Sequence, residues 1–189
     1  MNMCGEIDEE ITIPELVKEG SLCPHQDYVY FNYPTREEEQ EVRRFEERSK
    51  AMTEKIMQDT QFLTYVRSHK GFSGQLSDDL LLDNPAYLAS LLIYLQSQNI
   101  AFPSRLQRLL GAKKLPAMNV QWMERLLQGF LYDDVDSYLC DKTYRELLIA
   151  DLKSAGLIEK KKVVMTKSAA VEKMLTNSLG KCNSICLLY

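Results

Sequence analysis

The sequence is poor in the residues that build metal centres and nucleophilic active sites. It has only two histidines and one tryptophan among 189 residues, and its five cysteines are odd in number and scattered. This cysteine usage does not form a disulfide framework. The histidines, His25 and His69, lie in no catalytic motif. The sequence therefore argues against a disulfide-stapled fold and disfavours an enzyme.

Long apolar runs are also lacking. The chain contains no uninterrupted apolar window of about 18 residues, so no membrane-spanning helix is expected. Its amino terminus is acidic, and no apolar segment typical of a secretory signal follows it. We therefore expect a reducing location, cytoplasmic or nuclear, in which the thiols stay free.

Motifs for cofactors and metals are equally sparse. The glycines at 71 and 74 are not followed by the Lys-Ser or Lys-Thr of a phosphate loop. Cys23 and His25 form a chelating pair without a second pair. The aspartates of residues 133–136 lack the glycine and glutamate of a calcium loop, and we interpret them as a solvated loop that caps the next helix. We expect no cofactor, no metal and no catalytic residue.

Charge is distributed unevenly along the chain. The net charge of −4 gives the whole molecule no general attraction to nucleic acid. Residues 1–34 carry seven acids and one base, whereas residues 141–189 carry five acids and nine bases. The two ends could attract each other, or the basic end could face an anionic membrane or a polyanion. The simplest interpretation of the basic end is a solvated, lysine-rich surface.

The clearest structural signal is a helical pattern over residues 36–69. Thr35 and Glu38 form a capping box, and no glycine or proline interrupts the segment before Gly71. A helix of this span has about 34 residues and is roughly 50 Å long, and its narrow apolar stripe needs a surface to pack on. That surface could belong to this chain, to a second copy or to another protein. The stripe comprises Val42, Phe45, Ser49, Met52, Ile56, Asp59, Leu63 and Val66.

Shorter helices are expected after this segment. Four starts are signalled by capping residues or prolines, at Asn84–Pro85, Pro103, Asn119 and Asp141. We therefore predict an all-α protein with four parts. Residues 1–34 are an acidic, aromatic-containing arm, and 35–70 are the long amphipathic helix. Residues 75–180 are a compact helical domain, and 181–189 are a cysteine-containing tail.

The stretch 141–179 combines a helix, Gly156, an aliphatic pair and a basic turn, which predicts a small β-hairpin near residues 158–166. This layout resembles the end of winged-helix modules. The resemblance implies a nucleic-acid-binding role. Nucleic acid is nevertheless a less favoured partner than protein, because arginine is expected where bases are read and Arg145 is the only arginine nearby. The basic patch behind this alternative consists of Lys160, Lys161, Lys162 and Lys167.

The carboxyl-terminal tail provides a second alternative. Cys186 stands fourth from the end and is followed by two leucines, which is the pattern of a prenylation signal, although the final Tyr189 departs from it. Cys182 could take a second acyl chain, and nearby lysines could supply a basic patch. The tail would then make the chain a peripheral membrane protein lipidated at Cys186.

These observations favour a non-catalytic helical adaptor or regulatory subunit that binds other proteins. Its partners would be one or more proteins, and the protein could belong to a larger complex. Aromatic side chains in the acidic arm are the candidate anchors because burying each ring would supply much of the binding energy. These partner-binding candidates are Tyr28, Tyr30, Phe31 and Tyr33.

Overall fold

The long predicted helix begins at its capping box. The Thr35 side chain accepts from the backbone amide of Glu38, and the Glu38 side chain accepts from the backbone amide of Thr35, which starts α2 (Arg36–Met57). The computed structural model describes residues 13–20 and 34–177 of the chain. Within the arm it contains one short helix, α1 (Ile13–Lys18).

The predicted single helix over residues 36–69 is in fact two helices. Asp59 caps α3 (Thr60–Arg67), because its side chain accepts from the amides of Gln61 at 2.8 Å and Phe62 at 3.0 Å. The same carboxylate accepts from the Tyr144 hydroxyl at 2.6 Å, which ties the break to a distant helix. Asp59, one of the two polar residues in the apolar stripe, therefore marks the break between α2 and α3 and is not a position inside one continuous helix.

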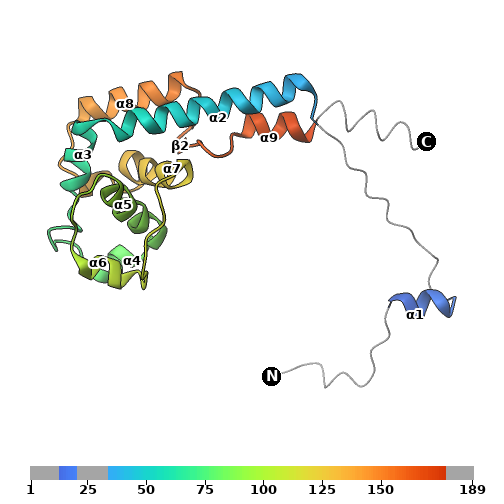
Figure 1. Cartoon of the computed structure of the whole chain (residues 1–189), viewed down its shortest axis with the longest axis horizontal. Helices are drawn as coiled ribbons and strands as arrows, with labels where there is room; N and C mark the ends of the chain where they lie inside the picture. The colour runs from blue at the N-terminus through green and yellow to red at the C-terminus, as the bar shows by residue number, and fades with distance from the viewer. Residues whose placement is uncertain (1–12, 21–33, 178–189) are drawn as a thin grey trace.

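The apolar stripe of α2 packs on the rest of this chain. Phe45, Met52 and Ile56 are buried in the main core, with α7 and α9 against α2. Figure 1 shows α8 alongside the carboxyl-terminal half of α2 and α9 alongside its amino-terminal half. An ion pair of 2.7 Å between Lys55 and Asp151 joins α2 to α8.

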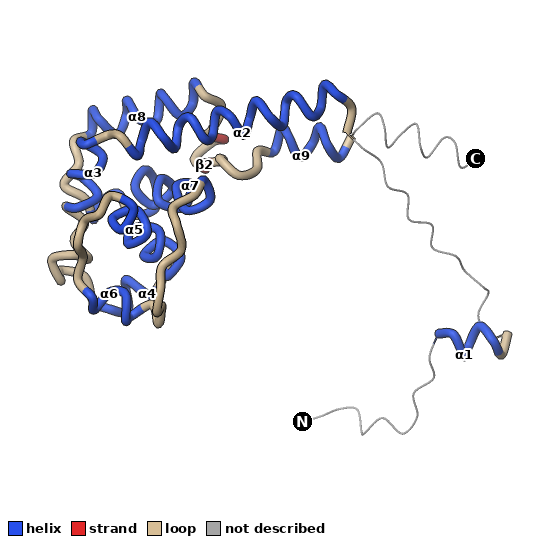
Figure 2. Tube along the Cα trace, viewed as in Figure 1, coloured by secondary structure: helices blue, strands red, loops and turns tan. Residues whose placement is uncertain are grey.

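Helices α5, α6, α7 and α8 begin close to the four predicted starts, and α4 was not predicted. Asn84 caps α5, Asn119 caps α7 and Asp141 caps α8, each through its side chain. The bounds are α4 (Asp78–Leu82), α5 (Pro85–Ser97), α6 (Ser104–Leu109), α7 (Val120–Gln128), α8 (Lys142–Ser154) and α9 (Ala169–Thr176). In Figure 2 these helices account for most of the trace, so the predicted all-α class is confirmed.

The core has two apolar clusters that meet at α5, whose flanks are both buried. One flank, with Tyr94 and Leu95, packs with α2, α3, α7 and the segment that follows α7. The other, with Leu92 and Ile93, packs with α4, α6 and the loop after α6. Residues 35–70 and 75–177 therefore share one core. Leu147 of α8 lies outside this core and is 62% exposed.

The predicted hairpin is present and small. β1 (Ile158–Glu159) pairs antiparallel with β2 (Lys162–Val163), with Ile158 opposite Val163 and Glu159 opposite Lys162. The segment that follows β2 is bound to α7 by Glu124, whose carboxylate accepts from the backbone amides of Met165 and Thr166 at 2.7 and 2.6 Å. Within the described residues, no helix combines the length and apolar character needed to cross a membrane.

Candidate binding site

The site is built around His69, which follows the end of α3 and is only 2% exposed. Its segment is held against the loop after α7 by two hydrogen bonds. Lys70 donates its amide to the carbonyl of Ser137 at 2.9 Å, and Leu139 donates its amide to the Ser68 hydroxyl at 3.0 Å. These contacts bring together residues that are far apart in the sequence.

After Gln128, the last residue of α7, the chain continues directly into a π-helical turn, Gly129–Asp133. In this turn the amide of Asp134 donates to the carbonyl of Gly129 at 2.8 Å. Such turns are rare and occur often at functional sites. A short 3₁₀ turn, Val135–Ser137, follows the π-helical turn. Asp134 lies between the two turns and contacts His69.

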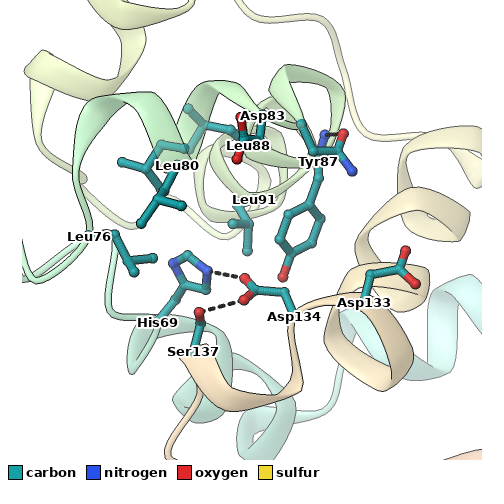
Figure 3. Close-up of a pocket in the computed structure, with 12 residues that line it drawn as sticks. His69, Leu76, Leu80, Asp83, Tyr87, Leu88, Leu91, Asp133, Asp134 and Ser137 are labelled. Carbon is teal, nitrogen blue, oxygen red and sulfur yellow. Dashed lines mark hydrogen bonds and ion pairs between the residues drawn. The ribbon is translucent and has the colours of Figure 1, made fainter.

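His69 and Asp134 form the central polar contact of the site (Figure 3). Nε2 of His69 lies 2.7 Å from an Asp134 oxygen, and Nδ1 accepts from the Gly71 amide at 3.1 Å. Because Nδ1 is an acceptor, the proton of the neutral ring is on Nε2 and is donated to Asp134. Both ring nitrogens are therefore engaged with protein groups.

Asp134 uses its second oxygen as well, accepting from the Ser137 hydroxyl at 2.5 Å. Burial alone would raise the pKa of the Asp134 carboxyl. The hydrogen bonds from His69 and Ser137 outweigh burial, so the pKa lies below its ordinary value. Asp134 is therefore ionised at neutral pH, and its two oxygens accept hydrogen bonds from His69 and from Ser137.

Aromatic rings surround this polar contact. The ring centre of Tyr138 is 4.9 Å from that of His69, and the centre of Phe72 is 5.6 Å from it, both in edge-to-face geometry. The hydroxyl groups of Tyr87 and Tyr138 hydrogen-bond to each other. Burial, followed by the nearby Tyr138, raises the pKa of the Tyr87 hydroxyl, so it stays protonated at neutral pH.

Two glycines leave room for this packing. A β-carbon at Gly129 would lie 2.0 Å from Cε2 of Tyr87, and one at Gly71 would lie 2.9 Å from Nδ1 of His69. Neither position requires a left-handed backbone, because neither glycine has a positive φ. Both glycines are therefore needed for close approach rather than for conformational freedom.

A cavity of about 320 Å³ opens beside this cluster, between α4, α5 and the turns after α7. Figure 3 shows Leu76, Leu80, Leu88 and Leu91 on one side of it and Asp133 and Asp134 on the other. Leu80 is 59% exposed at the mouth. Asp83, Asp133 and Asp134 supply three carboxylates, and no lysine or arginine is among the residues that line the cavity.

A second cavity of about 330 Å³ adjoins the first. It lies between the start of α5, α7 and the hairpin, and its charged lining residues are Glu124, Arg125, Asp133 and Lys162. Across residues 13–20 and 34–177, no three His, Cys, Asp or Glu side chains converge closely enough to hold a metal ion.

The predicted site residues fall in different places. The aromatic anchors Tyr28, Tyr30, Phe31 and Tyr33 and the lipidation candidates Cys182 and Cys186 lie outside the described residues. The lysines of the basic patch, Lys160, Lys161, Lys162 and Lys167, are all exposed, and Lys162 also lines the second cavity.

The prediction about the acidic loop is corrected. The loop does not cap the next helix, because Asp141 caps α8 through its own side chain. His69, which lies in no sequence motif, is buried and donates to Asp134, 65 residues away. The sequence held one signal for this site, an acidic cluster directly after a helix that contains a glycine near its end.

The comparisons with known proteins gave no match, whether with protein-family models, with curated proteins or with solved structures.

Proposed function

We propose that this protein is a non-catalytic helical adaptor or regulatory subunit, and that the cavity between α4 and α5 holds a side chain of its partner protein. The observation that carries the proposal is a cavity of about 320 Å³ with leucine walls and a carboxylate rim. A cavity of this size lies at the lower end of the range for ligand pockets, which suits one large side chain.

The mouth of the cavity supports a protein partner. Leu80 of α4 lines the cavity and is 59% exposed, so apolar surface continues from the cavity onto the face of the molecule. Exposed apolar surface around a pocket is typical of protein-binding sites, where a buried anchor contributes most of the affinity.

The rim defines the chemistry of the partner. The carboxylates of Asp83, Asp133 and Asp134 meet no lysine or arginine within the cavity lining. A matching segment therefore carries a large apolar residue beside a lysine or arginine, since opposite charges across an interface favour encounter and fix register.

Four hydrogen bonds, made by three side chains, support a non-catalytic role. The nitrogens of His69, the hydroxyl of Tyr87 and the hydroxyl of Ser137 are each bonded to another protein group. A general base must have a free acceptor within reach of the substrate proton. These three side chains instead stabilise the wall of the cavity.

The proposal can be tested with full-length protein and a phage-displayed library of random heptapeptides. We expect enrichment of peptides with a large apolar residue beside Lys or Arg. Leu80→Gln should weaken the selected peptides about tenfold, since it removes roughly 1.4 kcal/mol of apolar contact. Leu82→Gln is the matched control, because Leu82 is an exposed leucine of the same helix and does not line the cavity. Equal loss in both variants, or no enriched peptide, would contradict the proposal.

A further inference from the structure

The two cavities share part of their walls. Asn84, Tyr87 and Asp133 line both, so the cavities meet at the start of α5. The Tyr87 ring is buried and fixed by its hydrogen bond to Tyr138 and by the absence of a side chain at Gly129. The cavities therefore lie next to each other on either side of a well-held ring.

Their charges differ. The first cavity has three carboxylates and no cation from a lysine or arginine, whereas the second contains Arg125 and Lys162. The Glu124 carboxylate of the second cavity already accepts from the Thr166 hydroxyl at 2.8 Å and from two backbone amides. Three donors from this chain thus surround Glu124, while both cations stay exposed. The second cavity therefore offers exposed cations that the first lacks, beside the Asp133 carboxylate that both cavities share.

The cationic wall is held in position by the fold. Gln128 accepts from the amide of Val163 at 2.9 Å and donates to Asp133 at 3.0 Å, which joins the hairpin to the π-helical turn. The guanidinium of Arg125 lies 4.9 Å from the centre of the Trp122 ring, a distance typical of a cation–π contact. The Arg125 guanidinium and the backbone at Lys162 are therefore held beside the same cavity as Asp133.

From this arrangement we infer that the two cavities are subsites of one groove that recognises a linear segment with three successive features. These are a large apolar side chain in the first cavity, a lysine or arginine at Asp83 and Asp133, and an aspartate or glutamate at Arg125 and Lys162. The inference rests on the proposed function, because it specifies the segment that the same site binds. It also gives Lys162, part of the predicted basic patch, a role toward an acidic side chain of a protein rather than toward nucleic acid.

The test uses the same random heptapeptide library on full-length protein, with two variants that change only the second cavity. Arg125→Glu and Lys162→Glu reverse the exposed cations there. Lys160→Glu is the matched control, because Lys160 is an exposed lysine of the same hairpin that does not line the cavity. Affinities of the best peptides are then measured by fluorescence anisotropy at low and high salt.

We expect the enriched peptides to carry an acidic residue on the side of the basic residue that is away from the apolar one. Arg125→Glu and Lys162→Glu should each weaken these peptides about fivefold at low salt, and selection on either variant should favour a basic residue at that position. Lys160→Glu should change affinity less than twofold.

The outcomes separate the two proposals. Peptides that need Leu80 but show no preference at the acidic position, and that bind both charge-reversed variants unchanged, would overturn the two-subsite groove and leave the adaptor proposal standing. Absence of any peptide that depends on Leu80 would overturn both.

Discussion

The effect of Gly129→Ala on folding stability has opposite expected signs when it is judged from the backbone and from the packing of the Tyr87 ring. Gly129 has helical backbone angles, φ −63° and ψ −49°, at the start of the π-helical turn. In an ordinary helix, replacing glycine by alanine stabilises the folded state by about 1 kcal/mol. From the backbone alone, Gly129→Ala would therefore be a stabilising change.

The Tyr87 ring reverses this expectation. The new β-carbon would lie 2.0 Å from Cε2 and 2.4 Å from Cζ of the ring. Because carbon atoms pack best at about 3.5–4.0 Å, the ring must move by roughly 1.5 Å or more. Overpacking of this kind costs about 1–3 kcal/mol, and loss of the hydrogen bond between Tyr87 and Tyr138 adds about 1 kcal/mol. After the helix gain is subtracted, we expect Gly129→Ala to destabilise the protein by about 1–3 kcal/mol.

The assay is urea unfolding of the full chain, monitored by far-ultraviolet circular dichroism, with Ala150→Gly as the control. Ala150 is exposed within α8, so that variant measures the helix preference alone. A double-mutant cycle provides the decisive comparison. In a Tyr87→Ala background the clash is gone, and Gly129→Ala should become neutral or stabilising. The reasoning is refuted if Gly129→Ala has the same effect in both backgrounds, or if the single variant unfolds at higher urea than the parent protein.

Three further predictions concern other contacts. Asp134→Asn cannot accept from both His69 and Ser137, so we expect a loss of about 1–3 kcal/mol at pH 7. Because the pKa of Asp134 is lowered by folding, its contribution is present above the unfolded pKa of about 3.9 and is lost as pH falls through the folded value. Urea midpoints of the Asn variant should therefore fall less than those of the parent between pH 5 and about pH 3, and parallel curves would contradict this. Glu124→Ala should cost about 1.5–3 kcal/mol and speed hydrogen exchange at the amides after β2, and unchanged exchange there would oppose it. Lys160 has φ +58°, so Lys160→Gly should raise the urea midpoint by the equivalent of up to about 1 kcal/mol, and a lower midpoint would count against strain at this turn.

Most of the helices could be predicted because their signals are local. The capping box at Thr35 and the side-chain caps at Asn84, Asn119 and Asp141 are satisfied within three residues, so a short stretch of sequence contains both partners. The hairpin is likewise set by a two-residue turn between residues that face each other. Local hydrogen bonding of this kind needs no knowledge of the rest of the chain.

The break at Asp59 was missed although a local signal was present. Asp59 is a good amino-terminal cap, but the 3–4 spacing of apolar residues continues through it and predicted one helix. The hydrogen bond from Tyr144, 85 residues away, favours the cap over a continuous helix. The apolar period continues through Leu63 and Val66 because both belong to the core that α2 also uses, Val66 buried in it and Leu63 partly buried against it.

The site could not be predicted because its contacts join distant residues. His69 and Asp134 are separated by 65 positions, and neither lies in a motif that would pair them. The close approach of Gly129, at the start of the π-helical turn, to the Tyr87 ring likewise joins residues that no short sequence window includes. The sequence drew attention to the acidic loop for its charge but could not show which of its carboxylates is buried and bonded.

The two walls of the first cavity differ in how firmly the fold holds them, and this difference bears on affinity. Edge-to-face contacts run from Phe62 to Phe130, from Phe130 to Tyr138 and from Tyr138 to His69, at centre distances of 5.0, 4.8 and 4.9 Å. That wall is an extension of the core, so a ligand need not order it. The opposite wall includes α4, a five-residue helix whose buried side chain is Leu81 alone. Isolated turns of this length are marginal, so any ordering that a ligand imposes falls on α4. Ordering a wall when the peptide binds reduces the affinity for the peptide, whereas a preorganised wall carries no such cost. Substitutions that stabilise α4 without touching the cavity should therefore tighten peptide binding. Stabilising substitutions near His69 that do not touch the cavity should change only the free energy of unfolding.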